Sequence, residues 1–144
     1  YLLVSLFNLF ALLWLSDLFF GVKIAGSIWE LVGLSLVFII GSLGMGVLIS
    51  NLAQSQMQAI YLAVFVVLIP AIILSGLLFP RGDMPLVTYW YSELLPVTHY
   101  LEITRGIIMR GIPAGMLWWG STFPLLVLSV IYFVASVLAF RKRI

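Results

Sequence analysis

The sequence predicts an all-α membrane protein with four transmembrane helices and a short helical pair before the last of them. Hydrophobic residues make up 64% of the 144 residues and charged residues 8%, against roughly 25% charged in a soluble domain. A bilayer core about 30 Å thick requires roughly 20 apolar residues in a helix. Stretches of about this length recur along the chain, at residues 1–16, 31–50, 59–79 and 117–140.

Each stretch is expected to be a helix because backbone amides in lipid must be paired within their own segment or in a closed barrel. Barrel strands would alternate apolar and polar residues, whereas these stretches are apolar on both faces. The first stretch is the shortest and starts at Tyr1 rather than at a methionine. We therefore expect residues 1–144 to form one membrane domain, the C-terminal part of a longer protein, with its first helix ending near Asp17.

The second helix is expected to begin at Ser27. Ser27 and Glu30 have the spacing of a capping box, in which each side chain would bond the other residue's backbone amide. Trp29, between them, has the character of a residue at the membrane–water interface.

Small residues follow one another along the later half of this helix. Ser42, Gly46 and Ser50 are spaced by four, with Gly41 and Gly44 beside them. Small residues on one face let a second helix approach closely, so we predict a packing seam here. A groove that lines a substrate pathway is the alternative interpretation.

A polar, uncharged hairpin, residues 51–58, is expected to join the second and third helices. Asn51, Gln54 and Gln56 in this hairpin are either solvated or in contact with a partner protein. Pro70, near the middle of the third helix, removes one helical hydrogen bond and favours a kink. We consider it a candidate hinge.

Residues 86–110 are too charged to span a membrane and too apolar for a soluble loop. Pro96 is expected to divide them into two short helices. The first contains the aromatic cluster of residues 89–91, which suits headgroup depth. The pair either lies in the interface or enters the membrane and returns, a course that requires protein or water to shield its backbone.

The second helix of this pair aligns His99, Glu102 and Arg105 on one stripe, at steps of three residues. Ionisable groups at membrane depth tend to mark pathways or gates, so these residues and Glu93 are candidates for an outer gate. One alternative is a stripe that faces headgroups or water, with Glu102 and Arg105 paired. Another is a proton relay from His99 to Glu102.

The fourth span is expected to bend near Pro124 and to end at Phe140, before the basic residues 141–143. Charge does not decide which end of the protein faces the cytoplasm. Residues 141–143 lie on one side, whereas Lys23, Arg81, Arg105 and Arg110 would lie on the other, which leaves the positive-inside rule unsatisfied.

Signatures of enzymes and cofactors are missing from the sequence. There is one histidine and no cysteine, so a zinc site would need carboxylates for its other ligands. No phosphate-binding loop is present, and the glycine run at residues 41–46 lies inside a charge-free span. The formal net charge of +2 is scattered and indicates no nucleic-acid partner. We expect no catalytic residue, metal or cofactor.

Several segments, in order, resemble the permeases of type 2 ATP-binding-cassette exporters, and most closely the bacterial drug and multidrug permeases. They are Gly44–Ala59, then Pro70 with Leu74–Pro80 and Asp83–Pro85, then Leu95–Glu102 with Arg105-Gly106 and Arg110-Gly111, and finally the span that ends in Phe140–Arg143. The resemblance covers nearly the whole chain.

This resemblance implies the last four spans of a six-span permease in a bacterial inner membrane. It implies a second permease subunit, identical or not, and a separate ATPase partner on the cytoplasmic side. The C-terminus and residues 51–58 would be cytoplasmic, and residues 86–109 would be a re-entrant pair that caps the outer end of the pathway. The coupling segment that meets the ATPase would precede this chain.

Alternatives from other functional classes remain open at this point. A permease for polysaccharide or lipid-linked glycan shares the architecture. A membrane-embedded enzyme would use His99 and Glu102, and a structural assembly protein would show no coupling to ATP hydrolysis. The transported molecule is not evident from the sequence.

Overall fold

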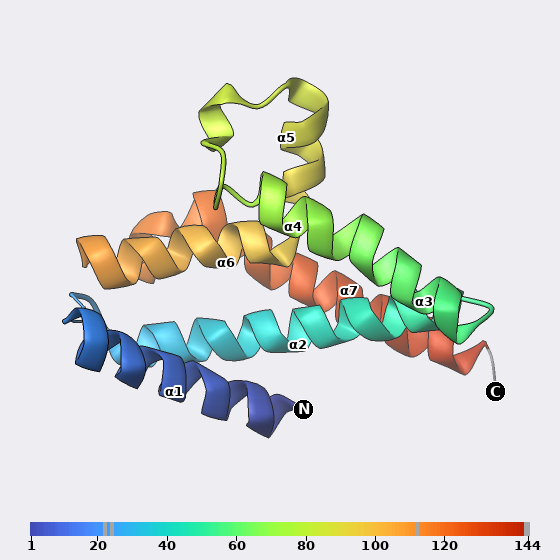
Figure 1. Ribbon diagram of the computed structural model, residues 1–144, viewed down its shortest axis with the longest axis horizontal. Helices are drawn as coiled ribbons and strands as arrows, with labels where there is room; N and C mark the ends of the chain where they lie inside the picture. Colours follow the sequence, from blue (N-terminus) through green and yellow to red (C-terminus); the bar gives the residue numbers. More distant parts are fainter. Residues whose placement is uncertain (22, 24, 112, 143–144) are drawn as a thin grey trace.

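The computed structural model describes residues 1–142 apart from 22, 24 and 112, and this part of the chain folds into helices joined by short turns (Figure 1). Four helical segments are long and apolar enough to cross a membrane, which confirms the predicted all-α membrane fold. They are Leu2–Phe20 (α1), Ile28–Leu52 (α2), Gln56–Leu74 (α3, η1 and α4) and Gly120–Arg141 (the end of η5, and α7).

The remaining elements lie between the third and fourth segments. Two are short α-helices, α5 (Leu86–Glu93) and α6 (Pro96–Arg105), and α6 continues into the π-helical turn η3 (Gly106–Arg110). The others are single turns: η2 (Arg81–Asp83), η4 (Ala114–Leu117) and the beginning of η5 (Trp118–Thr122). The basic stretch expected after Phe140 is described only as far as Lys142, so Arg143 lies outside the described residues.

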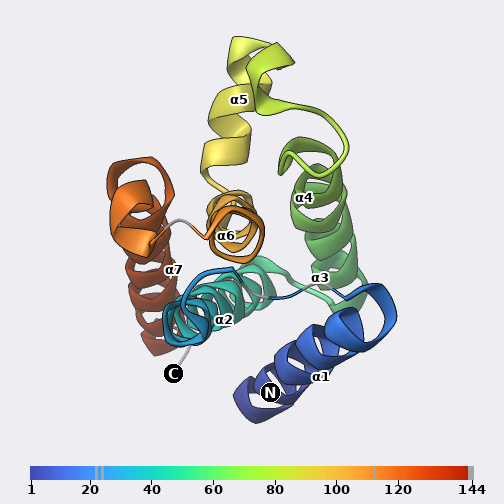
Figure 2. The ribbon, with the colours of Figure 1, turned by 90° about the vertical axis from the view of Figure 1, so that its left-hand side faces the viewer.

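Helix α6 occupies the centre of the bundle. Viewed along the long axis, it is surrounded by α2, α4, α5 and α7, whereas α1 lies at the edge (Figure 2). Leu31 of α2, Ile103 of α6, Ile107 of η3 and Leu125 of α7 are fully buried against one another. No residue of α1, all of which are described, is buried. The core therefore forms where α6 meets α2 and α7.

The predicted helical pair is divided at Pro96, as expected. Residues 94 and 95 break the helix, and Pro96 is the first residue of α6. Helix α6 then runs alongside α2 instead of across its end (Figures 1 and 2). At its far end Gly111 adopts φ 65°, a left-handed cap whose amide bonds the carbonyl of Gly106. Helix α5 lies across the long axis of the bundle and α6 runs along it (Figure 1). That the pair is re-entrant stays a prediction.

Both prolines inside the spans follow a π-helical turn. Ala63–Leu68 (η1) precedes Pro70, and η5 precedes Pro124. A proline has no amide hydrogen to donate, and its ring collides with the carbonyl four residues before it. A wider turn in front of the proline relieves that collision, and such turns are a recognised cause of bends in helices.

Two helix ends differ from the prediction, and a glycine explains each. The first helix continues past Asp17 to Phe20 and ends at Gly21, which has φ 62°. The third span ends at Leu74 rather than Phe79, because Gly76 has φ 87°, a backbone conformation that residues other than glycine rarely adopt. The expected spans 1–16 and 59–79 are therefore corrected to 2–20 and 56–74.

A variant of the capping box lies in the α2–α3 turn, whereas at the start of α2 the expected hydroxyl cap of Ser27 is missing from the described residues. Ser27 is the N-cap residue of α2, but among the described residues its side chain makes no capping hydrogen bond. In the turn, the Ser55 hydroxyl accepts the amide hydrogen of Gln58 at 3.2 Å, and the Gln58 side chain accepts that of Gln54 at 2.9 Å. This reciprocal arrangement fixes the tight turn between α2 and α3.

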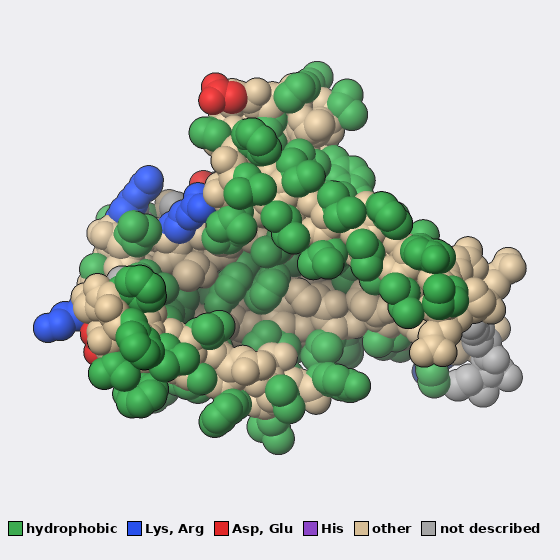
Figure 3. Space-filling model, viewed as in Figure 1, with side chains coloured by type: hydrophobic (Ala, Val, Ile, Leu, Met, Phe, Trp, Pro, Cys, Tyr) green, Lys and Arg blue, Asp and Glu red, His purple; other side chains and the backbone are tan. Residues whose placement is uncertain are grey.

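Hydrophobic side chains cover much of the surface (Figure 3). Large apolar residues exposed by more than half include Phe7 and Trp14 in α1, Phe65 in η1 and Ile131 in α7. In water this exposure would be strongly unfavourable, whereas in hydrocarbon it has no such cost. The surface agrees with a chain that lies in a membrane.

Candidate functional site

A cluster of ionisable side chains joins the end of the third span to the helical pair α5 and α6. Arg81, in η2 just after α4, forms an ion pair with Glu93 at the end of α5. A second nitrogen of Arg81 lies 3.2 Å from Glu102 of α6. His99 of α6 completes the group, which we call the Arg81 cluster (Arg81, Glu93, His99 and Glu102).

Aromatic and hydroxyl groups surround the arginine and its partners. The guanidinium of Arg81 lies 5.0 Å from the centre of the Tyr89 ring, in a cation–π contact. The Ser121 hydroxyl donates to Glu102 over 2.6 Å, which ties the cluster to the beginning of the last span. The cluster therefore connects η2, α5, α6 and η5 at one place.

His99 is fully buried and lies against Glu93. Its Nε2 atom is 2.9 Å from the backbone carbonyl of Glu93 and 3.5 Å from the carboxylate of the same residue. Burial lowers the pKa of His99 to about 4, and the positive charge of Arg81 acts in the same direction against a smaller opposing effect of Glu102. His99 is therefore neutral at pH 7 and donates Nε2–H to the carbonyl.

Since His99 is neutral, the cluster holds one cation and two carboxylates at pH 7. The side chains of Arg81 and Glu93 are 20% and 25% exposed, so water screens their attraction only in part. Removing the arginine would leave Glu93 without its ion-pair partner, whereas the Glu102 side chain is 46% exposed and would be screened by water. Arg81 thus holds α5 and α6 against the end of α4.

The four predicted gate residues lie along α6 and at the end of α5. The pair of Glu102 with Arg105 does not form among the described residues. Arg105 bonds the carbonyl of Gly76 at 3.1 Å and forms no ion pair with Glu102 in the described part of the chain. His99 faces Glu93, so the geometry provides no direct relay from His99 to Glu102. The role of these residues as a gate stays a prediction.

Arg81 is the member that sequence reasoning missed. On sequence alone Arg81 counts only among the charges that bear on orientation, because nothing in the local pattern links it to carboxylates 12 and 21 residues later. A usable signal existed: it is a cation directly after a span, in a chain with few charges to balance the two carboxylates.

Helix α5 also contacts the third span at the break before Pro70. Because Pro70 lacks an amide hydrogen, the carbonyl of Val66, four residues earlier, has no α-helical partner at that position. The Tyr91 hydroxyl of α5 donates to this carbonyl. The break at Pro70 is therefore linked to the helix that carries Glu93.

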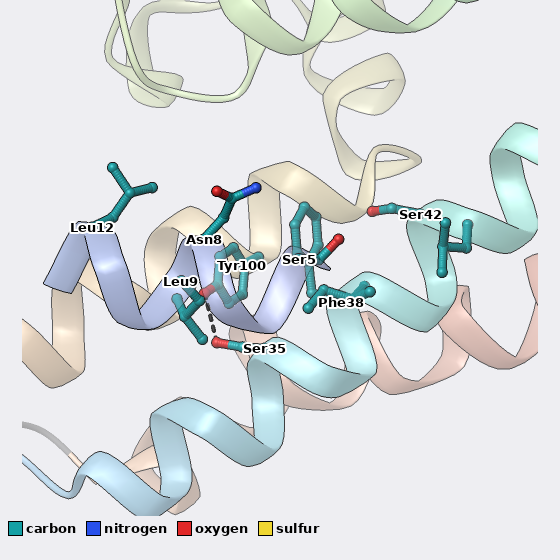
Figure 4. A pocket seen from close by; sticks show the side chains of 10 residues that line it. Ser5, Asn8, Leu9, Leu12, Ser35, Phe38, Ser42 and Tyr100 are labelled. Atoms are coloured by element: carbon teal, nitrogen blue, oxygen red, sulfur yellow. Dashed lines mark hydrogen bonds between the residues drawn. The ribbon is translucent and has the colours of Figure 1, made fainter. Parts of the chain in front are cut away.

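A cavity of about 410 Å³ lies between α1, α2 and α6 (Figure 4). On its wall the Tyr100 ring is stacked on Phe38 at 4.3 Å. Ser35 donates to the Leu31 carbonyl at 2.6 Å, so its oxygen accepts from Tyr100 at 2.6 Å. Such a mostly apolar cavity with a few polar groups suits an amphiphilic molecule. It is lined by Ser5, Asn8, Leu9, Leu12, Ser35, Phe38, Ile39, Ser42, Leu43 and Tyr100.

Within this chain, α2 meets α7 through the two glycines beside the predicted packing seam. Gly41 and Gly44 are the closest points to α7: a Cβ on Gly41 would lie 2.5 Å from the Ser129 hydroxyl, and one on Gly44 would lie 3.0 Å from α7 backbone atoms. Ser42, Gly46 and Ser50 are instead exposed within this chain.

The face with Ser42 and Gly46 lines cavities. Ser42 borders the cavity of Figure 4, and both residues border an apolar cavity of about 400 Å³ between α2, η1 and the start of α6. The position of these residues agrees with the groove interpretation better than with a seam inside this chain. Contact with a second subunit stays a prediction.

The predicted hairpin residues lie around the α2–α3 turn. Asn51 is in the last turn of α2, Gln54 is exposed in the turn, and Gln56 is the first residue of α3. The structure contains only this one chain, so a partner at the turn stays a prediction.

The site and fold are those of a helical membrane protein in which a short helical pair, α5 and α6, is tied by charges to the segments that flank it. The chain belongs to the ABC-2 type transporter family, because the model of that family matches residues 1–109. Permeases are among its relatives. The chain is 36% identical over 112 residues to the probable multidrug ABC transporter permease YbhR of Escherichia coli K12, a match that covers 78% of this chain and 28% of YbhR.

Two further Escherichia coli K12 relatives are similar. The probable multidrug ABC transporter permease YbhS is 30% identical over 121 residues, covering 83% of this chain and 29% of YbhS. The inner membrane transport permease YhhJ is 32% identical over 126 residues, a match that covers 86% of this chain and 33% of YhhJ. The chain thus spans about a third or less of the length of these relatives. No solved structure gives a significant match.

Proposed function

We propose that this chain is part of the membrane-spanning permease subunit of an ATP-driven exporter in a bacterial inner membrane. Membership of the ABC-2 type family and the names of YbhR, YbhS and YhhJ support a transport role. The observation that carries the proposal is helix α6, enclosed by the spans and tied by the Arg81 cluster at one end. This arrangement suits a gate over a pathway, and the chain itself is not an enzyme.

The subunit works as a pair and is driven by a separate ATP-binding-cassette ATPase. The exposed apolar surface of α1 supports contact with lipid or a second permease subunit. The ATPase acts at the end of the bundle that holds both the α2–α3 turn and the end of α7 (Figure 1). That end is cytoplasmic, with Asn51, Gln54 and Gln56 as candidate contacts.

Transport follows from a change in how the spans and the re-entrant pair lie against one another. Closure of the ATPases rocks the two permease halves, and the bend at Pro70 passes this motion to α5 through the Tyr91–Val66 bond. Opening then requires the Arg81 ion pairs to separate or exchange. The cavities beside Ser42 suit amphiphilic cargo.

The gate is tested in the full-length permease, reconstituted with its ATPase in proteoliposomes. Arg81→Gln should uncouple the system, with ATPase activity that no longer responds to transported drug and export reduced about tenfold or more. Asp83→Asn is the matched control, because Asp83 is an exposed charged residue of the same turn outside the cluster. Export unchanged by Arg81→Gln, or by Glu102→Gln and Arg105→Gln, would contradict the gate.

The hinge is tested separately at Pro70. Pro70→Ala restores an amide hydrogen that can satisfy the Val66 carbonyl within the helix, so the bend and its link to α5 should weaken. We expect export and drug-stimulated ATPase activity to fall together. If both rates equal those of the unmodified protein, Pro70 is not a hinge.

A further inference from the structure

A cavity of about 250 Å³ lies next to the Arg81 cluster and carries an excess of positive charge. The end of α4 and η2 form one wall, and α6 with η3 forms the other. Its charged lining residues are Arg81, Glu102, Arg105 and Arg110. Basic side chains gather over α6 on the face shown in Figure 3.

Two buried hydroxyls line this cavity without a partner. Thr98 is fully buried and Ser75 is 4% exposed, and the side-chain oxygen of each has no hydrogen bond among the described residues. The Nε atom of Arg81 is unpaired in the same way. Buried polar groups are nearly always hydrogen-bonded in native proteins. An acceptor bound in the cavity would satisfy these donors.

The cations of the cavity are only partly balanced. The Glu102 carboxylate is occupied by Arg81 and by the Ser121 hydroxyl. Arg105 uses one nitrogen for the Gly76 carbonyl and keeps its other donors. Within the part of the chain that the structure describes, Arg110 forms no ion pair. An anion that enters the cavity would meet two arginines without carboxylate partners.

We propose that this cavity binds one phosphate group, carried by an anionic phospholipid or present as free phosphate. Guanidinium groups bind phosphate oxygens through paired hydrogen bonds, and the hydroxyls of Ser75 and Thr98 provide further donors. Leu77, Leu78 and Phe79 lie between lining residues in the sequence and are 54%, 60% and 57% exposed. They offer an apolar surface for acyl chains beside the headgroup.

The test is native mass spectrometry of the full-length protein, released from a neutral detergent and titrated with dioleoylphosphatidylglycerol. We expect one phosphatidylglycerol per subunit to bind tightly, and Arg105→Gln or Arg110→Gln to weaken that binding about tenfold. Arg110→Lys should retain much of the affinity. Arg141→Gln, at the opposite end of the bundle, is the matched control and should bind as the unmodified protein does.

A competition with inorganic phosphate distinguishes an anionic phospholipid from free phosphate as the ligand. If phosphate at about 10 mM displaces phosphatidylglycerol, or raises the melting temperature of the unmodified protein but not of Arg110→Gln, free phosphate is also a ligand. If it does neither, the site is for lipid. Equal phosphatidylglycerol binding by the arginine variants and the control, with no effect of phosphate, would overturn the proposal. No ATPase is present in these assays, so the result is independent of the proposed transport function.

Discussion

Tyr91 of α5 donates its hydroxyl hydrogen to the carbonyl of Val66, four residues before Pro70. The single oxygen atom on Tyr91 therefore compensates for the amide hydrogen that proline lacks, and it does so from a different helix. A proline kink is usually a property of one helix. Here its hydrogen bonding depends on the position of the helical pair.

Tyr91→Phe removes this hydroxyl and leaves the ring in place. The Val66 carbonyl then loses a partner, and we expect the free energy of unfolding in detergent to fall by about 1 kcal/mol. Tyr89→Phe is the matched control, since among the described residues the Tyr89 hydroxyl has no hydrogen bond and its ring contacts are kept. Equal stability of the two variants, measured by denaturant unfolding, would show that the bond does not matter.

His99 should make stability depend on pH. Its pKa is lowered by burial from 6.5 to about 4, so between these values the unfolded chain takes up a proton that the folded chain does not. The contribution is complete above pH 6.5 and is lost as pH falls toward 4. The loss amounts to at most about 3 kcal/mol.

The measurement is the unfolding midpoint of the full-length protein in detergent between pH 7.5 and pH 4.5. A His99→Gln variant keeps a donor for the Glu93 carbonyl but does not titrate, so its stability should fall less over the same range. If the unmodified protein and the variant show the same pH profile, His99 does not carry the effect.

Among the elements, α2 and α7 pack closely because two glycines expose the α2 backbone. At Gly41 an added Cβ would lie 2.5 Å from the Ser129 hydroxyl and 3.0 Å from the Ser129 Cα, so both side chain and backbone of α7 are in its way. At Gly44 it would approach the backbone of Tyr132 and Phe133, so the whole helix would have to shift. Small residues at helix contacts in membranes allow this proximity.

The effect of a glycine-to-alanine substitution in α2 on the free energy of unfolding should therefore depend on its position. Gly44→Ala and Gly41→Ala should each lower the free energy of unfolding by about 1–3 kcal/mol through overpacking against α7. Gly46→Ala meets no atom within 4 Å and should be neutral or stabilising, because alanine is the better helix former. Unfolding in a graded denaturant series ranks the three. A loss at Gly46 equal to that at Gly44 would contradict the packing described here.

At the scale of the whole molecule, the sequence was sufficient for the features that depend on composition and on local breaks. The spans follow from apolar length, and the division of the helical pair follows from Pro96. It did not predict the helix ends at Gly21 and Gly76, since a glycine in a membrane helix is as compatible with packing as with a left-handed cap.

The candidate site was less predictable, because its contacts join residues far apart in the chain. The charges Glu93, Glu102 and Arg105 stood out as unusual in an apolar chain. The pairing of Arg81 with two carboxylates depends on how η2 folds back onto α6, which no local pattern determines. In the same way, the choice between Gly41 and Gly46 as a contact point depends on which face of α2 meets α7.

The arrangement of the spans predicts that the α2–α3 turn and the η2 turn lie on opposite sides of the membrane. One span, Gln56–Leu74, separates them, and Gln54 and Asp83 are both exposed in their turns. The chain contains no cysteine, so Gln54→Cys and Asp83→Cys can each be placed in a full-length background without other cysteines. A membrane-impermeant maleimide should label Asp83→Cys in intact cells and Gln54→Cys only in inverted vesicles. Labelling in the reverse pattern would keep the fold but invert the orientation, and with it the proposed ATPase side. Labelling of both positions from the same side would mean that Gln56–Leu74 does not cross the bilayer, and the re-entrant assignment of α5 and α6 would then be wrong as well.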